Sequence, residues 1–217
     1  MFEKHKIIVG WTITLSTVYA IVRYHLFKSV PLYQFYPEII NKGISLGAIL
    51  LICFSITVGP LSRLFPTKLT SIHKGKRYYG LWGFGLATIH SIVSIIFYKP
   101  NYYPRFFIHY SLNTIGEIVL YTGIFSLLLL SIAFIVSFPK IMKVQSINFK
   151  RSQFAGYMGL IIAGAHVVPM GIDGWKITHL WPGYLVPITL ISFLAVIFTV
   201  LLRMWFIFMT SFKKKKS

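Results

Sequence analysis

Six long apolar segments occupy most of this chain of 217 residues, and they constrain its fold more than any other feature. They cover approximately residues 7–22, 43–62, 78–98, 113–138, 152–170 and 185–209. A helix needs about 20 apolar residues to cross the roughly 30 Å hydrocarbon layer of a bilayer. In that layer the backbone has to satisfy its own hydrogen bonds, which favours helices. The sequence therefore predicts an all-α integral membrane bundle of six transmembrane helices.

These segments leave no room for a soluble domain, so residues 1–217 are predicted to form a single membrane domain. A signal segment is the alternative for the short first run, but no small-residue cleavage site follows it, and we expect a helix there. No strand is expected, and hence no strand-associated G-x-G-x-x-G nucleotide site. Cys53 is the single cysteine, which excludes an intramolecular disulfide and a cysteine-based metal cluster.

Basic residues give the chain a formal net charge of +18, with 22 Lys and Arg against four acids. They gather at both ends of the chain and in the loops that follow the second and fourth segments. This distribution is typical of the cytoplasmic side of a membrane protein. Both termini are therefore predicted to be cytoplasmic, in a multi-pass protein of the cell membrane (the inner membrane in a Gram-negative bacterium). We expect the charge to attract anionic membrane lipid and expect no nucleic-acid partner.

Two histidines inside apolar segments are the main candidates for a functional role. His90 and His166 lie in the third and fifth segments, which cross the membrane in the same direction. At 1.5 Å per residue, both lie at a similar depth in the outer half of the membrane. Ionisable residues at such depth are costly and usually functional. Two imidazoles at one depth can bind the iron of a haem from its two faces.

A glycine precedes each histidine by seven residues: Gly83 before His90, and Gly159 before His166. Seven residues make nearly two helical turns, so each glycine shares a face with its histidine. One interpretation is that the two glycines leave a slot that binds a porphyrin. The other is that they are packing glycines beside buried, hydrogen-bonded histidines. The spacing alone leaves both interpretations open.

Two segments resemble helices of the ferric reductase-like transmembrane family. Residues 76–90, KRYYGLWGFGLATIH, resemble its third helix, in which a basic, glycine-containing start precedes a haem-ligand histidine. Residues 149–166, FKRSQFAGYMGLIIAGAH, resemble its fifth helix, which begins with an aromatic residue and a basic pair. Helix number, topology and length are similar to small bacterial members, such as the haem subunit of the methionine sulfoxide reductase system. The resemblance implies that His90 and His166 are the ligands of an outer haem.

The ligands of the family's inner haem have no counterpart in this chain. The matching positions are Lys76, fourteen residues before His90, and Gln153, thirteen before His166. The resemblance therefore implies one haem b per chain, in a transmembrane oxidoreductase or electron-transfer subunit. Electrons would come from a membrane quinol, from a flavin (FMN or FAD) or from a partner reductase, and pass to ferric iron or an acceptor protein outside. The expected contacts of a flavin phosphate are Lys68, Lys74, Lys76, Arg77, Lys150 and Arg151.

Other assignments of the ionisable residues remain open. His179, thirteen residues after His166, is the alternative haem ligand, although its loop position favours the outer surface. Arg203 is expected to pair with a haem propionate or with Glu117, or to extend to the cytoplasmic side.

Two functions from other classes are alternatives to a haem-binding electron-transfer protein. One is a small proton-coupled transporter, in which His90, His166 and Glu117 form a relay. The other is a non-catalytic assembly subunit.

Overall fold

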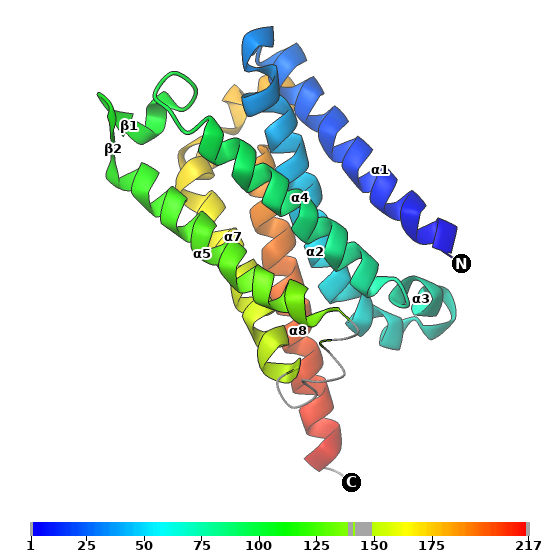
Figure 1. Ribbon diagram of the computed structural model, residues 1–217. Helices are drawn as coiled ribbons and strands as arrows, with labels where there is room; N and C mark the ends of the chain where they lie inside the picture. Colours follow the sequence, from blue (N-terminus) through cyan, green and yellow to red (C-terminus); the bar gives the residue numbers. More distant parts are fainter. Residues whose placement is uncertain (1, 139–140, 142–148, 216–217) are drawn as a thin grey trace.

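The computed structural model describes residues 2–138, 141 and 149–215 (Figure 1). In this part of the chain the α-helices are α1 (Phe2–Ala20), α2 (Asn41–Leu64), α3 (Pro66–His73), α4 (Lys76–Ile96), α5 (Thr114–Val136), α7 (Phe149–Lys176) and α8 (Ile188–Lys215). Six helical spans of the described residues are long and apolar enough to cross a membrane: Glu3–Phe27, Leu32–Leu64, Lys76–Ile96, Thr114–Val136, Gln153–Lys176 and Pro182–Thr210. The predicted all-α bundle of six membrane helices is confirmed.

Helix α2 is the central helix of the bundle. It packs along α4 and also contacts α1, α3 and α8 (Figure 1). Small residues let its neighbour approach closely, because a Cβ atom added at Gly43 would lie 2.8 Å from the Cα of Thr17 in α1. On the other side of the bundle α5 packs along α7, α8 contacts both α7 and α2, and α4 contacts α5. Helices α2, α4, α5 and α7 therefore enclose the interior that holds the candidate residues.

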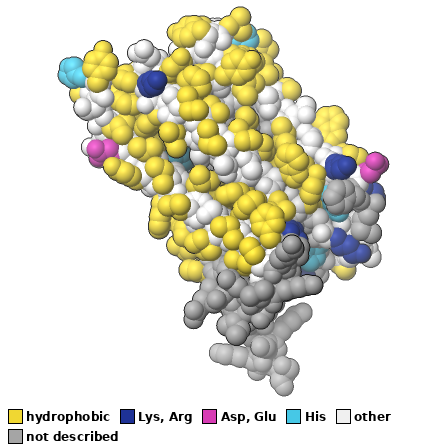
Figure 2. Space-filling view, viewed as in Figure 1, with side chains coloured by type: hydrophobic (Ala, Val, Ile, Leu, Met, Phe, Trp, Pro, Cys, Tyr) yellow, Lys and Arg dark blue, Asp and Glu magenta, His cyan; other side chains and the backbone are white. Residues whose placement is uncertain are grey.

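The surface is largely apolar, with basic side chains gathered at one end. Hydrophobic side chains cover most of the face shown in Figure 2, whereas Lys and Arg gather near α3. We call the end formed by α3, the C-terminal part of α2 and the start of α4 the basic end. The opposite end, formed by residues 21–40, 97–113 and 177–187, is called the loop end. A large apolar surface is what the hydrocarbon layer of a bilayer requires of a membrane protein.

The first connection at the loop end contains more helix than the sequence predicts. Helix α1 continues as a π-helix (Ile21–Phe27), and the second span begins with a 3-10 turn (Leu32–Gln34) and a π-helix (Phe35–Ile40). The buried Arg23 stabilises this arrangement, because its Nε donates hydrogen bonds to the carbonyls of Leu185 and Val186 at 3.2 and 3.1 Å. The second span is therefore longer than its apolar run.

The second long connection contains a short antiparallel hairpin of β1 (Phe107–Ile108) and β2 (Ser111–Leu112). The turn has His109 at a positive φ of 57°, a backbone conformation typical of two-residue hairpin turns. The expectation of no strand is therefore wrong at this place. Three 3-10 turns complete the loop end: Pro104–Phe106, Thr178–Leu180 and Pro182–Tyr184.

Candidate functional site

His90 of α4 is held by a buried asparagine of α2. Its Nδ1 lies 2.9 Å from Oδ1 of Asn41, and Asn41 is only 2% exposed. The amide nitrogen of Asn41 donates in turn to Oγ of Ser94 at 2.9 Å, which orients the amide oxygen toward the ring. Because that oxygen only accepts hydrogen bonds, Nδ1 of His90 carries the proton and Nε2 keeps its lone pair.

His166 of α7 is held in a similar way by α5. Its ring packs over Gly123, where an added Cβ atom would lie 2.9 Å from Cε1 of the histidine. Nδ1 lies 3.3 Å from Oγ1 of Thr122, and the ring also bonds to the backbone of Val119. The Thr122 hydroxyl donates to the carbonyl of Ile118, so it accepts from Nδ1. The Nε2 of His166 is therefore the unprotonated nitrogen as well.

The structure brings these two histidines together. They lie close enough for a positive charge on one ring to disfavour a charge on the other. Nδ1 of each ring faces a polar side chain of a neighbouring helix, Asn41 for His90 and Thr122 for His166. A ring held at one nitrogen, with the lone pair of the other free, is the form in which histidine binds a metal. The described residues contain no group of three His, Cys, Asp or Glu for a bare metal ion, whereas haem iron needs only two axial ligands.

Gly83 and Gly159 do not provide the predicted slot. A Cβ atom at Gly83 would lie 2.7 Å from Cγ1 of Ile52 and 3.0 Å from its amide nitrogen. A Cβ atom at Gly159 would lie 2.9 Å from Cγ of Leu130 and 3.1 Å from its amide nitrogen. Each glycine thus marks the point where its helix approaches a neighbour, α4 against α2 and α7 against α5. The slot interpretation is wrong because neighbouring backbone fills this space, and the packing interpretation holds.

The remaining ionisable candidates lie away from the two histidines. His179 is exposed in the 3-10 turn Thr178–Leu180 at the loop end, as its position in the sequence suggests. Glu117 is exposed in the first turn of α5, at the same end. Arg203 lines a cavity at the basic end, so the predicted pairing of Arg203 with Glu117 does not form. The exposure of Glu117 also separates it from the interior relay that a transporter would need.

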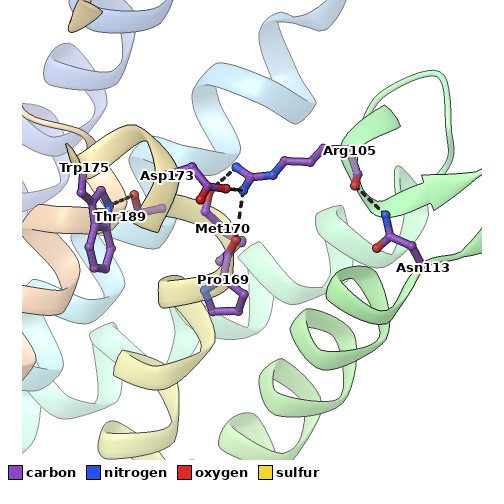
Figure 3. Close-up of polar contacts among 7 residues, drawn as sticks. All are labelled: Arg105, Asn113, Pro169, Met170, Asp173, Trp175 and Thr189. Atoms are coloured by element: carbon purple, nitrogen blue, oxygen red, sulfur yellow. Dashed lines mark hydrogen bonds and ion pairs between the residues drawn. The ribbon is translucent and has the colours of Figure 1, made fainter. Parts of the chain in front are cut away.

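The loop end is joined to α7 by an arginine (Figure 3). Arg105 donates from Nη1 to the carbonyl of Met170 at 3.0 Å and from Nη2 to that of Pro169 at 3.4 Å. It also forms an ion pair with the carboxylate of Asp173. Asn113, which caps α5, donates to the carbonyl of Arg105 at 2.8 Å. These bonds connect the start of α5 with the C-terminal part of α7, the helix that carries His166.

A second feature lies at the basic end, in a cavity of about 610 Å³ between α2, α4, α5, α7 and α8. Its lining includes Lys76 and Gln153, the two positions that match the inner haem ligands of the resembling family. Of the residues expected to contact a flavin phosphate, Lys76 and Arg77 line this cavity. The side chains of Lys150 and Arg151 lie outside the described part of the structure.

No protein-family model matches the chain, and no curated protein matches it. The resemblance to ferric reductase-like proteins therefore stays a prediction from the residues.

Sequence reasoning missed both partners of the histidines, Asn41 and Thr122. A polar residue at the edge of an apolar run was a usable signal for Asn41. Thr122 gave none, because helical threonines ordinarily bond their own backbone.

Proposed function

We propose that this chain is a b-type haem membrane protein that transfers electrons toward an acceptor on the outer side of the membrane. One observation carries the proposal. His90 and His166 come from two different helices, lie close enough for a charge on one ring to affect the other, and have Nδ1 hydrogen-bonded by side chains of neighbouring helices. This donor set fits haem iron, which takes one imidazole on each face. Gly83 and Gly159 contribute to helix packing and not to a haem-binding slot.

In this proposal the protein binds and orients the haem through few side chains. When bound, the haem supplies an iron centre that takes up and releases one electron. His90 and His166 would hold it through Nε2. Asn41 and Thr122 accept the Nδ1 protons, which fixes both ring orientations and raises the basicity of the binding nitrogens. The apolar segments around the pair limit the access of water and so tune the reduction potential.

The proposed electron donor binds at the basic end, as a quinol or a flavin (FMN or FAD). Lys68 and Lys74, on α3 and just after it, are exposed there and are available to a flavin phosphate. The proposed acceptor, ferric iron or a partner protein, binds at the loop end. The hairpin at that end has exposed side chains, with Ile108 at 62% and Tyr110 at 90% exposure. Tyrosine is common in docking surfaces.

The absorbance spectrum of the purified protein tests the proposal. We expect a reduced b-type spectrum for the wild type, and its loss or strong reduction in His90→Ala and in His166→Ala, because each removes one axial ligand. His179→Ala is the matched control and should keep a normal low-spin spectrum, since His179 is exposed in a loop. The assignment is wrong if His179→Ala loses the haem while His166→Ala keeps it. A wild-type protein that stays colourless after expression with added haem would contradict the function itself.

A further inference from the structure

The cavity at the basic end has a charged lining of one sign. Its basic side chains are Arg63, Lys76, Arg77 and Arg203. The four acidic residues of the chain are Glu3, Glu38, Glu117 and Asp173. All four acids belong to the described residues, and none of them lines the cavity. The protein therefore supplies positive charge here without a carboxylate to balance it.

Arg203 is the basic residue here whose charge most needs a partner, because it lies within a membrane-spanning segment. Its Nε is buried and has no hydrogen-bond partner among the described residues. Its guanidinium carbon lies 5.3 Å from the centre of the Tyr157 ring, which is a weak contact for a full charge. A buried guanidinium nitrogen without an acceptor is costly, and an anion that accepts two hydrogen bonds is a good partner for an arginine.

His73 reports the positive potential at this cavity. It ends α3, and its Nε2 would lie 3.8 Å from a Cβ atom added at Gly59. Burial lowers the pKa of His73, and the positive charges of Lys76 and Arg63 lower it further. The imidazole is therefore largely neutral at neutral pH, and the positive charge of the cavity comes from the arginines and lysines. A bound anion would offset their repulsion.

Much of the remaining lining is apolar and lies toward the middle of the bundle. Phe84 and Phe134 stack with ring centres 4.3 Å apart, and both line the cavity together with Ile52, Ile56 and Leu130. A small inorganic anion would match the arginines but leave this apolar wall without a partner. The combination fits an amphiphile with an anionic head at the basic end and a hydrocarbon part against the aromatic pair.

We propose that the cavity binds one anionic phospholipid, with its phosphate on Arg203 and the neighbouring basic side chains. The acyl part lies against Phe84 and Phe134. Anionic lipids are concentrated in the cytoplasmic leaflet, and the distribution of basic loops predicts that the basic end faces this leaflet. The lipid neutralises charge that the protein leaves unbalanced and fills the space between five helices. The proposal is independent of haem binding at the other half of the bundle.

Thermal unfolding of the full chain in a neutral detergent tests this proposal. Phosphatidylglycerol should raise the unfolding midpoint by roughly 5 °C at saturation, because a ligand that binds the folded state stabilises it. Phosphatidylcholine, which carries no net charge, should raise it much less. Inorganic phosphate and FMN distinguish a soluble phosphate from a lipid. A shift with either of them and none with phosphatidylglycerol would overturn the lipid assignment.

Variants locate the effect. Arg63→Gln/Arg203→Gln should lose most of the phosphatidylglycerol shift, whereas Arg105→Gln, at the loop end, should keep it. Gln153→Glu is nearly isosteric and provides a second test that does not depend on the folding of the double variant. Its carboxylate places a negative charge at the cavity, so the midpoint without lipid should rise and the shift with lipid should shrink. An unchanged shift in both the double variant and Gln153→Glu would contradict the proposal.

Discussion

At the residue scale, Asn41 is the polar residue on which the orientation of His90 depends. Asn41→Leu removes the acceptor of the Nδ1 proton and the donor to Ser94. We expect it to lower the free energy of unfolding by about 1–3 kcal/mol, because two half-buried polar groups, on His90 and Ser94, lose their partner. We also expect weaker haem retention, since the ring is free to rotate. Thermal unfolding and the haem content of purified protein measure the two effects.

Ser94→Ala is the matched control for this change. It removes only the outer hydrogen bond of Asn41 and leaves the bond to His90 intact. Its cost should be about 1 kcal/mol or less, with normal haem content. Equal haem loss in both variants would show that the network acts through general stability and not through the orientation of the imidazole.

At the element scale, two glycines of α4 separate helix packing from helix propensity. Gly83→Ala places a Cβ atom 2.7 Å from Cγ1 of Ile52 and 3.0 Å from its backbone nitrogen. The two helices have to move apart, which should cost about 1–3 kcal/mol. Gly85→Ala is the control, because nothing among the described residues lies within 4 Å of the added atom. It should be neutral or stabilising by about 0.5–1 kcal/mol.

Thermal unfolding of the two variants in the same detergent provides the comparison. A loss of stability confined to Gly83→Ala supports the close contact of α4 with α2. Similar midpoints for both variants would mean that the contact at Gly83 is not tight in the folded protein.

The two glycines also show why the spacing of glycine and histidine led to a wrong interpretation of the sequence. A glycine in a helix indicates a close approach, but the sequence does not say whether a ligand or another helix approaches.

At the scale of the whole molecule, the predicted orientation places the basic end in the cytoplasm. Most of the 22 Lys and Arg lie near the chain termini and in the segments that follow the second and fourth apolar runs, which favours retention on the cytoplasmic side. A C-terminal reporter enzyme that is active only after export should therefore stay inactive. A fluorescent protein fused at the same position should fold and fluoresce. High activity of the export-dependent reporter would contradict the orientation, and with it the leaflet assigned to the lipid.

The number of haems per molecule is the second prediction at this scale. We expect one haem per chain, because Lys76 and Gln153 occupy the positions of the inner ligands in the resembling family. Pyridine haemochrome absorbance, divided by the protein concentration from amino-acid analysis, gives the ratio. A ratio near two would assign a second haem to the cavity at the basic end. That result would also remove the space proposed for the lipid.

The sequence by itself determined the membrane character of this protein and its six helical spans. Both follow from the length and apolarity of local segments, because a bilayer imposes one length and one backbone solution on each of them. It also singled out His90 and His166, since ionisable residues are conspicuous in apolar runs.

Only the tertiary structure decided what these helices present to one another. It showed that Asn41 meets His90, that Gly83 meets Ile52, and that described residues from α2, α3, α4, α5, α7 and α8 line one cavity. A soluble helix reveals its buried side by an apolar stripe, whereas a helix in lipid is apolar on nearly every side. The rotation of each helix, and therefore the partners of its few polar residues, is set by packing between segments far apart in the chain.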